Sequence, residues 1–443
     1  MKKTIIASLL LAYLTSGSAS VQAAIEADLQ APSLAYTPCT SVNKSANQTQ
    51  FESWLPGLMQ SFNALPEVAA QQARRTQAEL SIKAADQAVY NPELGLDYQN
   101  ASDDSYTLGI SQTIDWGDKR GAATRKAQLE SEIMLSDISL ERSQMLADSI
   151  LSLVEQAQNR KAVVFQKQQL QAAKTQFEIA KQQMQVGDLS AVELKLIQLD
   201  VASKAADYAI AEQASITSDA NVLMLLGDSE LPFSGFLGAL SLPKISTQVD
   251  PDLPALRSAY QQVLLAKVTV QQVKADTSAD PTVSLNAERE GEDNKFGLGI
   301  SIPLQVRNNY SETLAVASQD IAVAEQTYLA RERVLIQQQK KFHLSLPRLT
   351  ERYQDWRELV LNSGQEAASA LAQQWRAGDI NTSDYLQSQR QLSSSYLVGL
   401  TLETALYQSW LEWMGASGQL ESFLQAQLSA QPSHLASNTA AAL

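Results

Sequence analysis

The chain has 443 residues and a formal net charge of −14, because 48 acidic residues outnumber 34 basic ones. An acidic surface is repelled by nucleic-acid phosphates, so the composition argues against a nucleic acid as partner. Cys39 is the single cysteine, which excludes a disulfide within the chain.

Residues 1–23 are typical of a secretory signal peptide: two lysines precede a short apolar stretch, and small residues follow it. Its removal would take the net charge from −14 to −16. Later in the chain no apolar run approaches the ~20 residues that a membrane helix needs, so any membrane segment must consist of strands. Residues 24–60 are expected to be irregular, and residues 429–443 to be disordered.

Two halves of the chain carry the same landmarks in the same order, which predicts an internal duplication. The tetrapeptide Leu108–Ser111 recurs unchanged as Leu298–Ser301. The dipeptide Gly187–Asp188 recurs as Gly378–Asp379. Because matching landmarks are 188 to 191 residues apart throughout, we expect one structural domain made of two similar halves.

The two halves are residues 61–240 and 241–428. Each half is expected to begin with a helix that leads into a β-hairpin, at residues 93–114 in the first half and 282–304 in the second. In both hairpins apolar residues alternate with polar ones, which is typical of strands with one apolar face. Aromatic residues near the strand ends favour strands with lipid on one side and water on the other. The alternative is a small sheet whose apolar face packs on helices in a soluble core.

Four strands cannot close a barrel, and open strand edges in a membrane leave backbone groups unpaired, at several kcal/mol each. A membrane sheet of this size must therefore oligomerise. Three copies would supply twelve strands, enough to enclose a water-filled lumen, whereas two copies would supply eight, whose interior side chains fill.

Long helical hairpins are expected at 119–226 and 309–414, where residues that favour helices dominate. Residues 119–186 contain no proline and would reach ~100 Å as one helix. Apolar or small residues three and four apart predict a coiled-coil seam. Pro347 interrupts the second stretch, so a kink or local unwinding is expected near Leu346.

Both helical hairpins are predicted to turn at a Gly-Asp sequence. Glycine supplies the left-handed residue that ends a helix, and the polar residues after it can cap the next helix. The predicted turn residues are Gly187, Asp188, Leu189 and Ser190 in the first half, and Gly378, Asp379, Ile380 and Asn381 in the second.

These features together resemble the TolC family of outer-membrane efflux proteins over roughly residues 60–425. The resemblance implies an α+β membrane protein in which three subunits form one tube, with a 12-strand barrel in the outer membrane and a long periplasmic helical tunnel. It also implies a homotrimer in contact with outer-membrane lipid. The helical tips would meet a periplasmic adaptor, which connects to an inner-membrane pump of the RND or ABC type.

The resemblance further implies roles for residues near the turns. Trp375 would help to close the tunnel, and Glu193 and Asp384 would place six carboxylates around the aperture of a trimer, favouring cations. The alternatives are a helix-seam role for Trp375 and a favourable interaction of each acid with its helix dipole. The segment Asp115–Arg120 resembles a turn of the CzcC-like metal-efflux branch.

The sequence lacks the motifs of common enzymes: it has no phosphate loop, no His-Glu-x-x-His, no cysteine pair and no Gly-x-Ser-x-Gly. Two histidines and one cysteine cannot make up a metal-ligand set, and we expect no cofactor. The predicted function is a passive outer-membrane conduit of a tripartite efflux or type I secretion system, carrying small molecules or metal cations. The alternative is a periplasmic helical scaffold without a membrane barrel.

Overall fold

The computed structural model describes residues 44–100, 103–227, 231, 233, 235, 236, 249–361 and 363–429. The predicted signal peptide, Cys39 and all but the first residue of the predicted disordered tail lie outside these residues. Ser429, the exception, is the last residue of a helix.

The contacts divide the chain into two compact units, and each unit takes residues from both predicted halves. The tip unit consists of the described residues of Arg160–Gln213 and Gln354–Leu400. The strand unit consists of the described residues of Thr40–Asn159, Ala214–Tyr353 and Thr401–Leu443. Segments far apart in sequence therefore build each unit.

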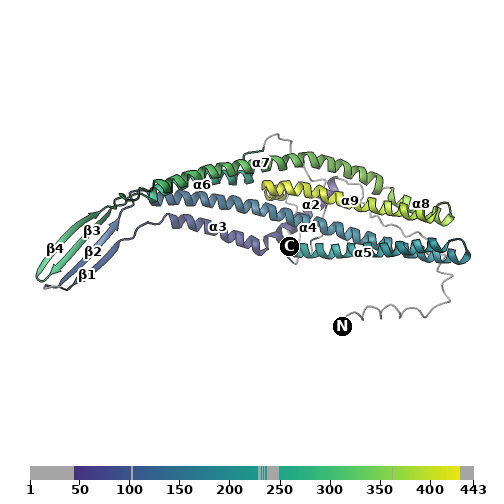
Figure 1. The fold of residues 1–443 in the computed structure, drawn as a ribbon, viewed down its shortest axis with the longest axis horizontal. Coiled ribbons are helices and arrows are strands. Elements are labelled where there is room, and N and C mark those ends of the chain that lie inside the picture. Colours follow the sequence, from purple (N-terminus) through teal and green to yellow (C-terminus); the bar gives the residue numbers. More distant parts are fainter. Residues whose placement is uncertain are drawn as a thin grey trace, which may run out of the picture. The chain divides into compact units, whose positions relative to one another are not determined.

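The strand unit contains the four predicted strands, which form one antiparallel sheet in the order β1-β2-β3-β4 (Figure 1). Their bounds are β1 Glu93–Gln99, β2 Ser105–Thr113, β3 Thr282–Glu290 and β4 Asp293–Ser301. The pairing of β2 with β3 joins the two predicted halves of the chain. Within the described chain, β1 and β4 each have one strand neighbour, so both edges of the sheet are open.

One face of this sheet is apolar and exposed. Leu96 on β1, Leu108 on β2 and Phe296 on β4 lie on it, and the Phe296 side chain is 87% exposed. The alternative from the sequence, a sheet buried against helices, is therefore not what this chain forms. Such a surface needs a covering environment.

Helices make up most of the remaining described chain. They are α2 Lys44–Asn63, α3 Pro66–Ala85, α4 Lys119–Val186, α5 Ala191–Leu226, α6 Pro254–Asp276, α7 Ser311–Trp356, the π-turn η2 Arg357–Leu361, α8 Gly364–Ala377, α9 Thr382–Ser417 and α10 Leu420–Ser429. No helix among the described residues has the length and apolar content needed to cross a membrane.

The expectation that residues 24–60 are irregular is wrong from residue 44 onward, where α2 begins. Phe51, Leu55, Leu58 and Phe62 recur at three- and four-residue spacing and are fully or almost fully buried in the strand-unit core. Pro56 lies inside this helix and lowers the preference of the local sequence for helical structure. Burial of large apolar side chains, at about 1.5–3 kcal/mol each, outweighs that cost.

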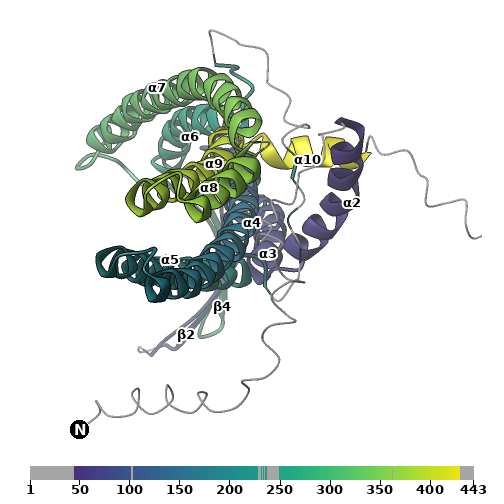
Figure 2. The ribbon, with the colours of Figure 1, turned by 90° about the vertical axis from the view of Figure 1, so that its right-hand side faces the viewer.

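The core of the strand unit gathers aromatic side chains from distant segments. Phe236 lies against Phe51, Tyr407 and Trp410, with ring centroids 5.2, 4.9 and 5.9 Å away. The backbone N–H of Phe236 also donates to the Tyr407 hydroxyl, at 3.0 Å. Helices α2 and α10 lie side by side in this unit (Figure 2). The core thus holds together the helices that carry the sheet.

Helix α7 runs through Pro347 without a break, and the helical pattern changes at η2 instead. The residue just before η2, Trp356, lies so close to Gly399 that a Cβ there would overlap the indole ring. Its Nε1–H donates to the Ser395 carbonyl, at 2.7 Å. Packing against α9 therefore accompanies the irregular turn, whereas Pro347 is tolerated within the helix.

Candidate functional site

The two predicted turns of the tip unit have the same backbone geometry. Gly187 has a φ of 88°, and the N–H of Asp188 donates to the Gln183 carbonyl at 2.9 Å. Gly378 has a φ of 80°, and Asp379 donates to the carbonyl five residues before it, also at 2.9 Å. This is the Schellman arrangement, in which glycine takes the left-handed position that side chains disfavour.

Each turn is followed by a side-chain cap on the next helix. The Ser190 hydroxyl accepts from the Glu193 N–H at 3.2 Å, and the Glu193 carboxylate accepts from the Ser190 N–H at 3.0 Å. In the second turn, the Asn381 Oδ1 accepts from the Asp384 N–H at 2.8 Å. The hydrogen bonds from Ser190 lower the pKa of the Glu193 carboxyl. Both predicted aperture acids therefore also stabilise the starts of their helices.

A chain of hydrogen bonds links the two turns. The Trp375 Nε1–H donates to the Thr382 hydroxyl at 3.3 Å, and that hydroxyl donates to Glu193 Oε1 at 3.3 Å. The Trp375 ring is 4% exposed and stacks on Tyr385, with centroids 5.1 Å apart. Within this subunit the ring thus has the helix-seam environment that we considered as the alternative to a closing role.

A small apolar core lies beneath the turns. Its buried members are Ala180, Ile197, Trp375, Tyr385 and Leu386. Burial raises the pKa of the Tyr385 hydroxyl to about 12. Of the predicted turn residues, Leu189 and Ile380 pack against this core and are half-buried. The exposed ones are Gly187, Asp188, Ser190, Gly378, Asp379 and Asn381.

Sequence reasoning missed a set of charged side chains between α5 and α9. The buried Asp200 has one oxygen 3.6 Å from Arg390 Nε, and the buried Lys204 donates to Ser393 at 3.4 Å. Burial raises the pKa of Asp200, although Lys204 and Arg390 act in the opposite direction. The signal in the sequence was the spacing of Asp200 and Lys204, three and seven residues after the apolar Ile197, which places both charges on the face of a buried residue.

A buried ion pair, missed as well, lies at the base of the strands, where β2 leads into α4. Lys119 Nζ lies 2.9 Å from Asp280 Oδ2, and their side chains are 14% and 4% exposed. The Tyr90 hydroxyl donates to the same carboxylate oxygen at 2.9 Å. The backbone N–H groups of Trp116 and Gly117 donate to Asp280 Oδ1, at 3.2 and 3.3 Å. We call Tyr90, Lys119 and Asp280 the strand-base clamp.

Ionisation in this clamp follows from its hydrogen bonds. Burial acts to raise the pKa of Asp280, but the hydrogen bonds from Lys119 and Tyr90 outweigh burial and lower that pKa. For Lys119, burial acts to lower the pKa, but the hydrogen bonds with Tyr90 and Asp280 prevail and raise it. Both groups are therefore held in their charged forms.

Metal-ligating residues do not gather in the described part of the chain: no group of three or more His, Cys, Asp or Glu side chains there could hold a metal ion.

The fold matches that of solved outer-membrane channels, which confirms the predicted class of long helices with four antiparallel strands. The outer-membrane channel OprN is 15% identical, with a TM-score of 0.69 over 84% of this chain and 91% of that one. The outer-membrane protein VceC from Vibrio cholerae is 15% identical, with a TM-score of 0.68 over 83% and 96%. The CmeC outer-membrane channel from Campylobacter jejuni is 12% identical, with a TM-score of 0.67 over 86% and 89%.

At these identities the likeness concerns the fold. No protein-family model and no curated protein sequence matches the chain.

Proposed function

We propose that the chain is the channel subunit of an outer-membrane export system, a passive conduit in a tripartite efflux or type I secretion assembly. The observation that carries this proposal is the four-stranded sheet with an exposed apolar face and two open edges, built on long helical hairpins. Solved outer-membrane channels share this fold.

The open edges support a closed trimer. When β4 of one copy pairs with β1 of the next, three copies supply twelve strands and no backbone edge faces lipid. The apolar face, with Leu94, Leu96 and Leu298, would then meet lipid. The opposite face, which carries Asp97, Glu288 and other polar residues, would line a water-filled lumen.

The helical turns are the proposed docking surface for a periplasmic adaptor, which would connect the channel to an inner-membrane pump. Their exposed residues Asp188, Ser190, Asp379 and Asn381 stand in a fixed backbone geometry that a partner could recognise. The channel itself would carry out no reaction, because the pump supplies the energy. In the trimer Glu193 and Asp384 would supply six carboxylates near the aperture, favouring cations.

Purification of the protein and electrical recording in planar bilayers test this function. The protein should fractionate with outer membranes, purify in detergent as a trimer by light scattering, and conduct ions in planar bilayers. Monodisperse, lipid-free monomers in plain buffer without conductance would overturn the proposal and favour the periplasmic scaffold.

Cargo is tested separately. The turn Asp115–Arg120, which resembles that of the metal-efflux branch, supports metal cations as one cargo class, and small molecules are the other. A deletion strain should gain sensitivity to metals or to drugs, and complementation with the intact gene should restore resistance. A strain whose sensitivity to both is unchanged would exclude both cargo classes.

A further inference from the structure

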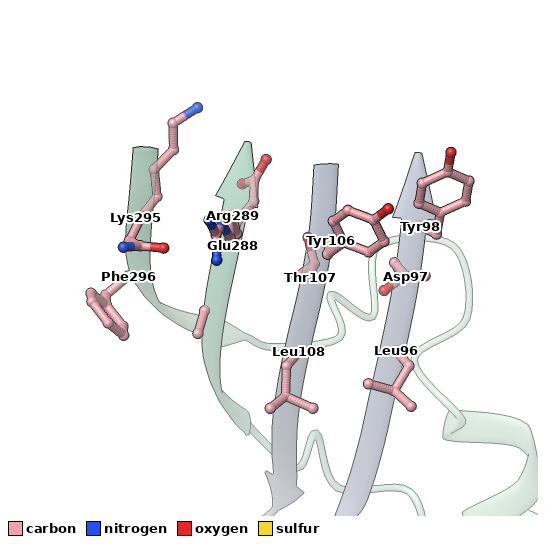
Figure 3. Close-up of a pocket in the computed structure, with 12 residues that line it drawn as sticks. Leu96, Asp97, Tyr98, Tyr106, Thr107, Leu108, Glu288, Arg289, Lys295 and Phe296 are labelled. Carbon is pink, nitrogen blue, oxygen red and sulfur yellow. The ribbon is translucent and has the colours of Figure 1, made fainter. Parts of the chain in front are cut away.

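One row of side chains crosses all four strands at the end of the sheet that carries the strand turns. The register pairs Tyr98 with Tyr106, Tyr106 with Arg289, and Arg289 with Asn294. Paired residues point to the same face of a sheet, and this face is the apolar one. The rings of Tyr98 and Tyr106 lie 5.1 Å apart (Figure 3). We call these four residues the polar-headed row.

Below this row the face is apolar. The next row towards the helices consists of Leu96, Leu108, Ala287 and Phe296, and the one after it of Leu94, Ile110, Leu285 and Leu298. Side chains with polar ends therefore begin where the purely apolar rows end. This sequence of rows is typical of the boundary between acyl chains and headgroups.

Arg289 is the one charged residue on the apolar face of the four described strands. Its side chain is exposed, and its Nε–H donates to the Gly291 carbonyl at 3.5 Å. Lys295, at the same end of the sheet, lies on the opposite face and forms an ion pair with Glu290. Within the described residues, no carboxylate lies at ion-pair distance from Arg289. Of these two cations, Arg289 on the apolar face therefore has no carboxylate partner among the described residues, whereas Lys295 on the opposite face has one.

We infer that the polar-headed row binds the phosphate group of an anionic lipid in the outer leaflet of the membrane; this rests on the proposed function. A guanidinium presents paired donors that match phosphate oxygens, and in a poorly hydrated boundary such charge-assisted bonds are strong. The tyrosine hydroxyls add donors beside it, and the two apolar rows accept the acyl chains. Within the strand unit, the turns between the strands lie at the end of the sheet away from helices α3 and α6, so a channel with periplasmic helices places this row in the outer leaflet (Figure 1).

The test measures lipid retained by the purified, membrane-inserted protein. The protein is reconstituted with phosphatidylcholine and one of two additions, bisphosphorylated lipid A or dephosphorylated lipid A. Native mass spectrometry then counts the lipid A molecules that remain bound in each case. Arg289→Gln should weaken binding of the phosphorylated lipid about tenfold. The matched control Lys295→Gln removes a positive charge at the same end of the sheet but on the other face, and should leave binding unchanged. Inorganic phosphate should not displace the lipid, because it lacks acyl chains.

Equal retention of both lipids, an equal loss in both variants, or displacement by inorganic phosphate would overturn this inference. Conductance separates that failure from failure of the proposed function. If Arg289→Gln inserts and conducts like the wild type while its lipid binding is unchanged, the lipid site alone is wrong. If the wild type neither inserts nor conducts, the channel function is wrong.

Discussion

Replacing Asp280 with alanine removes the acceptor at the centre of the strand-base clamp. Lys119 then becomes a largely buried ammonium without its carboxylate, and the backbone N–H of Gly117 loses its acceptor, whereas that of Trp116 keeps the Ile114 carbonyl at 2.9 Å. Breaking a buried pair on one side typically costs about 3–5 kcal/mol, mostly through the charge left behind. We therefore expect a fall in the unfolding midpoint of roughly 5–10 °C.

The matched control is Asp86→Ala, which removes the partner of Arg120 one residue further along α4. That ion pair is also short, at 3.0 Å, but its side chains are 52% and 55% exposed. Exposed pairs contribute about 0–1 kcal/mol, so this variant should melt close to the wild type. The double variant Lys119→Met with Asp280→Ala removes both charges of the clamp. It should lose less free energy of unfolding than the sum of the losses in the two single variants.

Circular dichroism during heating in detergent compares the single variants Asp280→Ala, Asp86→Ala and Lys119→Met, and the double variant, with the wild type. The clamp's contribution should also depend on pH. Because the pKa of Asp280 is lowered on folding, this carboxylate's contribution to the free energy of unfolding is fully present above its unfolded-state pKa of about 3.9. That contribution is lost as the pH falls through the lower, folded-state pKa. Because the pKa of Lys119 is raised on folding, the contribution of this ammonium group to the free energy of unfolding is lost only as the pH rises beyond its unfolded-state pKa of about 10.4. Equal melting of the Asp280 and Asp86 variants at neutral pH would refute this reasoning.

Four further outcomes are expected. Gly378→Val forces a β-branched residue to a φ of 80°, at a cost of roughly 1–3 kcal/mol, and should reduce adaptor capture in pull-downs while trimers persist; unchanged export would remove the turn from the docking surface. Changing Glu193 to Gln and Asp384 to Asn together should lower cation preference in reversal potentials, and an unaltered preference would contradict the acidic ring. Gly399→Ala should destabilise the protein by about 1–3 kcal/mol, because its Cβ meets an indole ring; a wild-type melting point would count against that packing. Burial keeps Tyr385 protonated, so comparing the ultraviolet titrations of the wild type and Tyr385→Phe should assign it a pKa of about 12, whereas ionisation near 10 would show that the hydroxyl is accessible to water.

Local patterns in the sequence were sufficient for the elements themselves. Alternation at period two predicted the strands, because side chains in a sheet point to opposite faces in turn. The Gly-Asp sequences predicted turns with glycine in the left-handed region, as Gly187 and Gly378 show. Open edges followed from counting strands, since hydrogen-bond geometry leaves four strands unclosed. The strand and turn predictions each depend on residues within a few positions of one another.

Other features depend on contacts between distant segments, and only the tertiary structure decided them. Asp280 meets Lys119 although the two residues belong to different halves of the chain, and Thr382 joins Glu193 across 189 positions. Helix α2 forms although its sequence was expected to be irregular, because its aromatic residues are buried in a core built by later segments. Packing partners that lie far apart in the chain leave no periodic trace, so their positions become known only when the whole fold brings them together.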